Sequence, residues 1–175
     1  MKRLLILLAA LPLFSSAAER IITLGGDVTE IVYALDAQSQ LVARDSTSTW
    51  PAATQSLPDV GYLRQLSTEG ILSLRPTLVL ASSQAQPSLV LQKVEGSKVK
   101  VVNVPGGYDA AAMDNKVQVI ADALGKQTQG DALRKTLHDD MAKIPAQPLN
   151  KRVLFILSHG GSGALVAGQQ TAADG

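Results

Sequence analysis

The sequence lacks cysteine entirely, and it has few aromatic residues and no excess of charge of either sign. Without cysteine, disulfide frameworks, cysteine-ligated zinc, iron–sulfur clusters, thiolate haem ligands and thiol catalysis are all excluded. The 16 basic and 15 acidic residues nearly cancel, so we expect no nucleic-acid partner and no general attraction to an anionic membrane. Hydrophobic residues make up 46% of the chain and charged ones 18%, which is typical of a folded protein rather than a disordered one.

Long hydrophobic runs are also scarce, and the one at the N-terminus predicts a signal peptide. An apolar run over residues 4–14 follows Lys2 and Arg3 and precedes four small residues that end at Ala18. This order is typical of a secretory signal, so we expect 1–18 to be removed after Ala18. The alternative, a membrane anchor, needs roughly 20 apolar residues. An exported chain without cysteine favours the periplasm of a Gram-negative cell.

Short apolar segments alternate with helical ones in the first two thirds of the chain. Strands are expected at 20–24, 41–43, 77–81 and 100–104, and helices at 28–35, 67–74 and 87–95. Asp27 and Glu30 have the spacing of a capping box, which sets the expected start of the first helix. The alternation predicts an α/β fold with a parallel sheet covered by helices on both faces.

Beyond residue 112 this alternation stops. Two helices are expected at 113–124 and 129–144 with no strand between them, and the second would be about 24 Å long. We interpret 19–112 as an N-terminal α/β lobe, 113–149 as a helical segment that contains a bridging helix, and 150–175 as the start of a truncated C-terminal lobe. The predicted fold is therefore α/β, two-lobed and helix-bridged.

Ligands of open α/β sheets bind at the carboxyl ends of the strands, and the irregular segment around Tyr62 lies among those ends in the chain. Tyr62 follows Gly61 and precedes Arg64 by two residues. A tyrosine phenolate is a known axial ligand of haem iron. The alternative interpretation makes Tyr62 a half-buried anchor of its loop.

The two histidines and Ser162 offer weaker signals. His159 follows a strand expected at 152–158 and precedes glycines, so it could face a cleft between lobes or be structural. His138 lies beside two aspartates in the predicted bridging helix, where we expect a solvated residue. Ser162 lies in a glycine-rich segment that lacks the last glycine of a nucleophile elbow. No phosphate-binding motif is present, so an enzymatic function is disfavoured.

Three stretches of the chain resemble a known family. Residues 59–71 read DVGYLRQLSTEGI, and weaker matches are ITLGGDVTEI at 22–31 and DNKVQVIADALG at 114–125. These stretches resemble class III periplasmic substrate-binding proteins of ABC importers, the helix-bridged type, and 59–71 resembles their haem-binding branch most. The resemblance implies a non-enzymatic carrier that captures haem and delivers it to an inner-membrane permease, with an outer-membrane haem receptor acting upstream.

The resemblance also implies roles for individual residues. Tyr62 would be the axial ligand of the haem iron, and Arg64 would stabilise the phenolate or pair with a haem propionate. His159 would be a pocket residue or a candidate second iron ligand. Trp50 would stack on the haem or lie at its rim, unless it only packs on the lobe surface. Glu69 would dock on the permease, and it also suits the first turn of a helix.

Two other functions stay open at this point. The same fold could carry a ferric siderophore or cobalamin, although the loops at the strand ends offer mainly Arg44 and Arg64 as cations. An exported serine hydrolase that uses Ser162 and His159 is the less favoured alternative.

Overall fold

The computed structural model describes residues 18–145, 153–158, 163–169, 171 and 173. Its main sheet has four parallel strands, β1 (Ile21–Leu24), β2 (Leu41–Arg44), β3 (Leu78–Ser82) and β4 (Lys100–Val104), in the order β2-β1-β3-β4. The predicted parallel α/β architecture is therefore confirmed.

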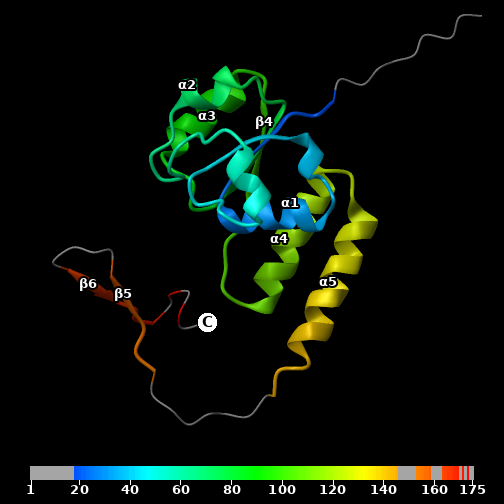
Figure 1. Cartoon of the computed structure of the whole chain (residues 1–175), viewed down its shortest axis with the longest axis vertical. Helices are drawn as coiled ribbons and strands as arrows, with labels where there is room; N and C mark the ends of the chain where they lie inside the picture. The colour runs from blue at the N-terminus through cyan, green and yellow to red at the C-terminus, as the bar shows by residue number, and fades with distance from the viewer. Residues whose placement is uncertain (1–17, 146–152, 159–162, 170, 172, 174–175) are drawn as a thin grey trace, which may run out of the picture.

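The central strands β1 and β3 are buried on both faces because helices cover the sheet from both sides (Figure 1). Ile21 points into a core that α1 (Gly26–Ala34) and α4 (Ala110–Ala123) complete. Its neighbour Ile22 points into the opposite core, beneath α2 (Thr68–Ser73) and α3 (Ser88–Gly96). Alternate residues of each strand thus enter opposite cores, as the period of two in a β-strand requires.

Helix α1 begins earlier than the capping-box spacing predicts. Gly25 is its N-cap, and Asp27 lies inside the first turn, where its Oδ1 accepts a hydrogen bond from the Val28 N–H at 2.9 Å. Gly25 has φ +123°, and a Cβ there would lie 2.9 Å from the Ser82 Cβ. The predicted capping box is wrong because close packing against the end of β3 requires the glycine to make the turn.

The remaining elements include α5 (Gln127–Met141), which packs against α4 and ends three residues before the predicted Ile144. Two 3-10 turns, Gln38–Gln40 and Ala52–Ser56, precede and follow β2. Strands β5 (Ile156–Ser158) and β6 (Ala164–Val166) form a separate antiparallel pair. No helix in the described part of the chain is long and apolar enough to span a membrane. The predicted bridging role of α5 and the lobe boundaries stay predictions.

Candidate functional site

The carboxyl ends of the four parallel strands bring four loops to one edge of the sheet. These loops begin at Gly25, Asp45, Ser83 and Pro105. The edge is the place where open α/β sheets bind their ligands. The four loops lie together because all four strands are parallel neighbours in one sheet.

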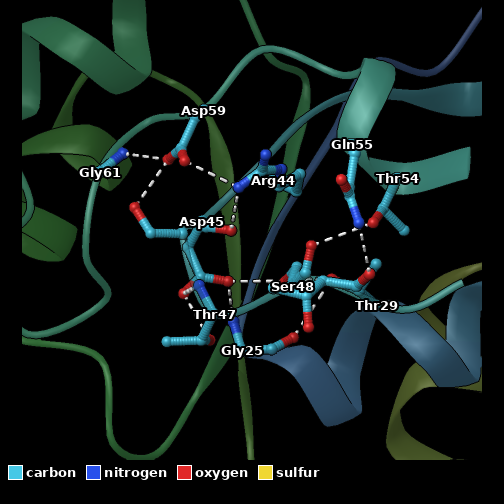
Figure 2. A network of polar contacts seen from close by, with 12 residues as sticks. Gly25, Thr29, Arg44, Asp45, Thr47, Ser48, Thr54, Gln55, Asp59 and Gly61 are labelled. Atoms are coloured by element: carbon cyan, nitrogen blue, oxygen red, sulfur yellow. Dashed lines mark hydrogen bonds and ion pairs between the residues drawn. The ribbon is translucent and has the colours of Figure 1, made fainter. Parts of the chain in front are cut away.

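A buried carboxylate, Asp45, organises the centre of this edge (Figure 2). Its Oδ1 accepts hydrogen bonds from the Gly25 N–H at 2.9 Å and the Ser48 hydroxyl at 2.7 Å. Its Oδ2 accepts two more, from the Thr47 N–H at 3.0 Å and the Thr47 hydroxyl at 2.6 Å. The Thr29 hydroxyl lies 2.7 Å from Ser48 Oγ and extends the network onto α1. The loop after β2 is thereby tied to the start of α1.

The loop that carries Tyr62 lies beside the end of β2. Its upstream part pairs with β2, because the Arg44 N–H donates to the Pro58 carbonyl and the Val60 N–H donates to the Arg44 carbonyl, both at 3.0 Å. Gly61 has φ +98°, a backbone conformation that favours glycine, and it turns the chain away from the strand. The Tyr62 side chain that follows is 44% exposed. This exposure is also compatible with the predicted alternative, a half-buried anchor of the loop, and both interpretations of Tyr62 stay predictions.

Downstream of Tyr62 the chain is fastened to the loop after β3. The Gln86 N–H donates to the Leu63 carbonyl at 2.7 Å, and the Leu66 N–H donates to the Gln86 carbonyl at 3.1 Å. The Arg64 guanidinium donates to Gln84 Oε1 at 2.8 Å. Arg64 thus has a neutral partner, whereas Arg44 is paired with the Asp59 carboxylate at 2.7 Å.

A groove of about 860 Å³, called the apolar groove below, lies between α1, α4 and α5. Its main apolar and aromatic lining residues are Trp50, Tyr108, Met113, Leu133, Leu137 and Met141. Lys116 and Asp27 form an ion pair of 2.5 Å within it. Tyr62 and Arg64 are not among the residues that line it.

Of the predicted site residues in the described part of the chain, Trp50 alone is among those that line the apolar groove. Trp50 lines the apolar groove and is 65% exposed, and Glu69 is exposed in the first turn of α2. Ser67 caps that helix, because its hydroxyl accepts a hydrogen bond from the Gly70 N–H at 3.0 Å. His159 and Ser162 lie outside the described residues.

His138 is exposed, as expected, but it also has a partner on another helix. Its Nε2 lies 2.7 Å from Asp114 Oδ2, so the side chain links α5 to α4. In the sequence, the visible neighbours of His138 are the two aspartates that follow it. The contact with Asp114 depends on the packing of α5 against α4, which the sequence does not show. Within the described part of the chain, no group of three or more His, Asp and Glu side chains could hold a metal ion. An oxygen ligand from a tyrosine is compatible with this finding.

Sequence reasoning missed the roles of Asp45 and Asp59. Each is an acidic residue in a loop, and such residues are usually solvated. The available signal was the position of Asp45 directly after an apolar strand, which brings its carboxylate to the sheet edge.

Comparison with known proteins gives a family match over most of the chain. A family model described as periplasmic binding protein matches residues 21–174. A vitamin B12-binding protein of Vibrio vulnificus (strain YJ016) is 33% identical over 97 residues, which are 55% of this chain and 36% of the relative.

Solved structures resemble the chain more extensively. The periplasmic heme-binding protein BhuT, in complex with two hemes, is 40% identical with a TM-score of 0.80, over 89% of this chain and 63% of that one. The periplasmic heme-binding protein RhuT from Roseiflexus sp. RS-1, in apo form, is 36% identical with a TM-score of 0.82, over 90% of this chain and 62% of that one. The chain thus spans about three fifths of these solved relatives and little more than a third of the curated one.

Proposed function

This chain belongs to the periplasmic binding protein family, and from that premise we propose that it captures ferric haem and delivers it to an inner-membrane ABC transporter. Family membership makes it a periplasmic binding protein and not an enzyme, so the serine hydrolase alternative is withdrawn. The cargo, the ligating residues and the delivery partner are the parts that are proposed.

The observation that carries the proposal is the presentation of Tyr62. Its phenol is exposed on a loop that is hydrogen-bonded to β2 on one side and to the loop after β3 on the other. Fe(III) is a hard ion that prefers oxygen donors, and a phenolate is a known axial ligand of haem. A fixed loop holds such a ligand in one geometry without a large loss of entropy on binding. We therefore assign Tyr62 as the iron ligand.

Arg64 supports the same cargo. Its only hydrogen-bond partner in the described part of the chain is the neutral Gln84 side chain, so its positive charge is not compensated by that contact. Two residues from Tyr62, it suits a haem propionate, because a guanidinium binds a carboxylate with two parallel hydrogen bonds. The heme-binding relatives, at 36% and 40% identity over about nine tenths of this chain, favour the same cargo.

Cobalamin is the second candidate cargo, and one observation favours it. The vitamin B12-binding relative is 33% identical over 97 residues of this chain. A ferric siderophore is less favoured, because anionic chelates call for several cations. Of the two arginines at the strand ends, Arg44 is already paired with Asp59.

Haemin titration of the protein and of Tyr62→Phe, followed by visible absorption, tests the proposal. We expect saturable binding with the spectrum of phenolate-ligated ferric haem. We expect Tyr62→Phe to lose that spectrum. Loss of a residue that only supports a metal ligand lowers affinity ~10–100-fold, so we expect loss of the ligand itself to lower haemin affinity by more than that.

Tyr108→Phe is the matched control, because Tyr108 is a second exposed tyrosine and lines the apolar groove instead. It should keep the wild-type spectrum. Equal haemin binding by wild type and Tyr62→Phe would refute the assignment of Tyr62. Saturable binding of cyanocobalamin, with no saturable binding of haemin, would replace the cargo.

A further inference from the structure

One carboxylate, Asp59, holds the upstream end of the loop that presents Tyr62 (Figure 2). Its Oδ1 accepts hydrogen bonds from the Gly61 N–H at 2.7 Å and the Ser46 hydroxyl at 3.0 Å. Its Oδ2 accepts one from Arg44 Nη1 at 2.7 Å. The side chain therefore joins the residue just before Tyr62 to the end of β2 and to the loop after it.

The backbone around Asp59 shows where this fastening ends. Residues 58–60 run parallel to the end of β2, with Asp59 opposite Arg44 in an isolated β-bridge. The Gly61 carbonyl accepts the last of these hydrogen bonds, from the Ser46 N–H at 2.9 Å. Beyond that point the chain turns at Gly61, whose φ is +98°. Since a Cβ at Gly61 would meet nothing within 4 Å, conformation and not space requires the glycine.

Backbone hydrogen bonds hold both ends of the Tyr62 loop, and the upstream end depends on the Asp59 side chain as well. Downstream, backbone hydrogen bonds to Gln86 fasten Leu63 and Leu66, and mutation of a side chain does not remove them. Upstream, the Gly61 carbonyl and the Val60 N–H also have backbone partners, but the N–H of Gly61 is held by the Asp59 side chain alone among the described contacts. Loss of that carboxylate should therefore loosen the residue that sets the direction of Tyr62.

The charge of Asp59 matters as well as its shape. The Arg44 side chain is only 13% exposed, so its guanidinium is mostly shielded from water and needs an anionic partner. Arg44 Nη1 also donates to the Asp45 carbonyl at 3.1 Å. Arg44 thereby connects Asp59 to the backbone of the residue that organises the sheet edge.

We propose that Asp59 is a positioning residue for Tyr62, which fixes the backbone at Gly61 so that the phenol meets the haem iron in one geometry. This inference deepens the proposed function and rests on it for the identity of the ligand. Asp59 acts through Gly61 and Arg44 and does not itself touch the haem.

The test compares Asp59→Ala with Asp131→Ala, a control that removes an aspartate paired with an arginine on α5. The first readout needs no ligand: hydrogen exchange of the backbone amides of residues 60–64, where those of Val60 and Gly61 are hydrogen-bonded, with the amides of β3 as the internal reference. We expect Asp59→Ala to speed exchange in 60–64 by about tenfold or more and to leave β3 unchanged, because the opening is local. Asp131→Ala should change neither segment.

The second readout is the haemin titration. Asp59→Ala should bind with roughly 10–100-fold lower affinity and an altered phenolate–iron absorption band, as expected for loss of a partner that orients a metal ligand. Asp59→Asn keeps an acceptor for the Gly61 N–H but loses the charge beside Arg44. We expect Asp59→Asn to keep slow exchange in 60–64, with a haemin affinity between those of the wild type and Asp59→Ala.

The outcomes separate this inference from the proposed function. Unchanged exchange at 60–64 in Asp59→Ala overturns the positioning role, whatever happens with haemin. Faster exchange with an unaltered haem spectrum also overturns it, because Asp59 would then hold the loop without positioning the ligand. If wild type takes up no haemin, the proposed function fails, and the exchange result still decides whether Asp59 holds Gly61. If Asp59→Ala does not fold, Ser46→Ala removes one of the three donors and is expected to show a smaller effect in the same direction.

Discussion

The Tyr62 loop and the apolar groove are built in opposite ways. The loop is held by hydrogen bonds and one ion pair, and it exposes a single phenol beside one guanidinium. The groove is formed by apolar side chains on α1, α4 and α5 together with Trp50 and Tyr108, and its polar contact is the pair between Lys116 and Asp27. The first surface offers directional chemistry, whereas the second offers apolar area.

This difference bears on which surface can select a cargo. Coordination of an iron atom depends on the direction of one oxygen, so the ligand must be held by a rigid support. Apolar area attracts many ligands or segments of chain without distinguishing them strongly. A surface that selects ferric haem is therefore expected at Tyr62 and not in the apolar groove. The predictions below disturb one surface at a time.

Replacing Asp45 should have the largest effect on stability. Its carboxylate is fully buried and accepts four hydrogen bonds from Gly25, Thr47 and Ser48. Asp45→Ala would leave the buried Gly25 N–H and Ser48 hydroxyl without their acceptor, and each unsatisfied buried group costs ~1–3 kcal/mol. We expect the free energy of unfolding to fall by about 3 kcal/mol or more, since the groups share one site and do not add fully. Urea unfolding followed by circular dichroism measures it.

Asp122→Ala is the control for this change, because Asp122 is exposed on α4 and accepts one hydrogen bond from Gln118. It should alter the free energy of unfolding by no more than ~0.5 kcal/mol. A loss below about 1 kcal/mol in Asp45→Ala would mean that water replaces the carboxylate as acceptor. The description of this edge as a rigid support would then be wrong.

Enlarging Gly130 should disturb the groove side instead. Gly130 is buried where α5 crosses α4, and a Cβ there would lie 2.5 Å from the Ala121 Cβ. Gly130→Ala therefore forces the two helices apart, and we expect it to lower the free energy of unfolding by ~1–3 kcal/mol. Haemin affinity should not change, because no hydrogen bond of the described residues joins the Tyr62 loop to this crossing. Thermal unfolding and the haemin titration together measure both effects.

Gly96→Ala is the matched substitution on the other face of the sheet. Gly96 is the last residue of α3, and a Cβ there meets nothing within 4 Å. We expect it to be neutral or to stabilise by up to about 1 kcal/mol, because alanine restricts the unfolded chain. If Gly130→Ala lowered haemin affinity while Gly96→Ala did not, the helix crossing would be coupled to the ligand surface.

The sheet and most helices could be predicted from the sequence because their signals are local. Strand β4 was predicted over the residues that it occupies, since an apolar run ends there at Pro105. The Ser67 cap was likewise visible as a serine just before a helical pattern. The start of α1 could not be predicted in this way, because it depends on the close approach of Ser82 to Gly25, and Ser82 is far away in the chain.

In the candidate site, too, local features could be predicted from the sequence and contacts between distant segments could not. Tyr62 was found through a motif and a flanking glycine, which are local features. The partners of Asp59 and Asp45 come from other loops, and the apolar groove combines residues from four stretches of the chain. Such sites depend on which helices and loops meet, and the hydrophobic pattern of a single sequence does not specify those contacts. The predicted roles of His159 and Glu69 stay predictions.

Removal of the Trp50 side chain should have the smallest effect and gives the sharpest comparison of the two surfaces. Trp50 is 65% exposed and lines the apolar groove. Trp50→Ala should change the free energy of unfolding by no more than ~0.5 kcal/mol, because little of the ring is buried. We expect the phenolate–iron spectrum to be unchanged and haemin affinity to fall by at most about threefold, or ~0.6 kcal/mol.

Trp50→Phe is the control, since it keeps an aromatic ring that can stack on a porphyrin. If Trp50→Ala weakened haemin binding more than Tyr62→Phe did, while Trp50→Phe restored it, stacking in the groove would dominate over coordination at Tyr62. The apolar groove would then be the primary haem surface, and the rigid support around Asp45 and Asp59 would serve stability alone. Equal small effects of both substitutions would instead place Trp50 at the rim, where an aromatic ring covers apolar surface without choosing the ligand.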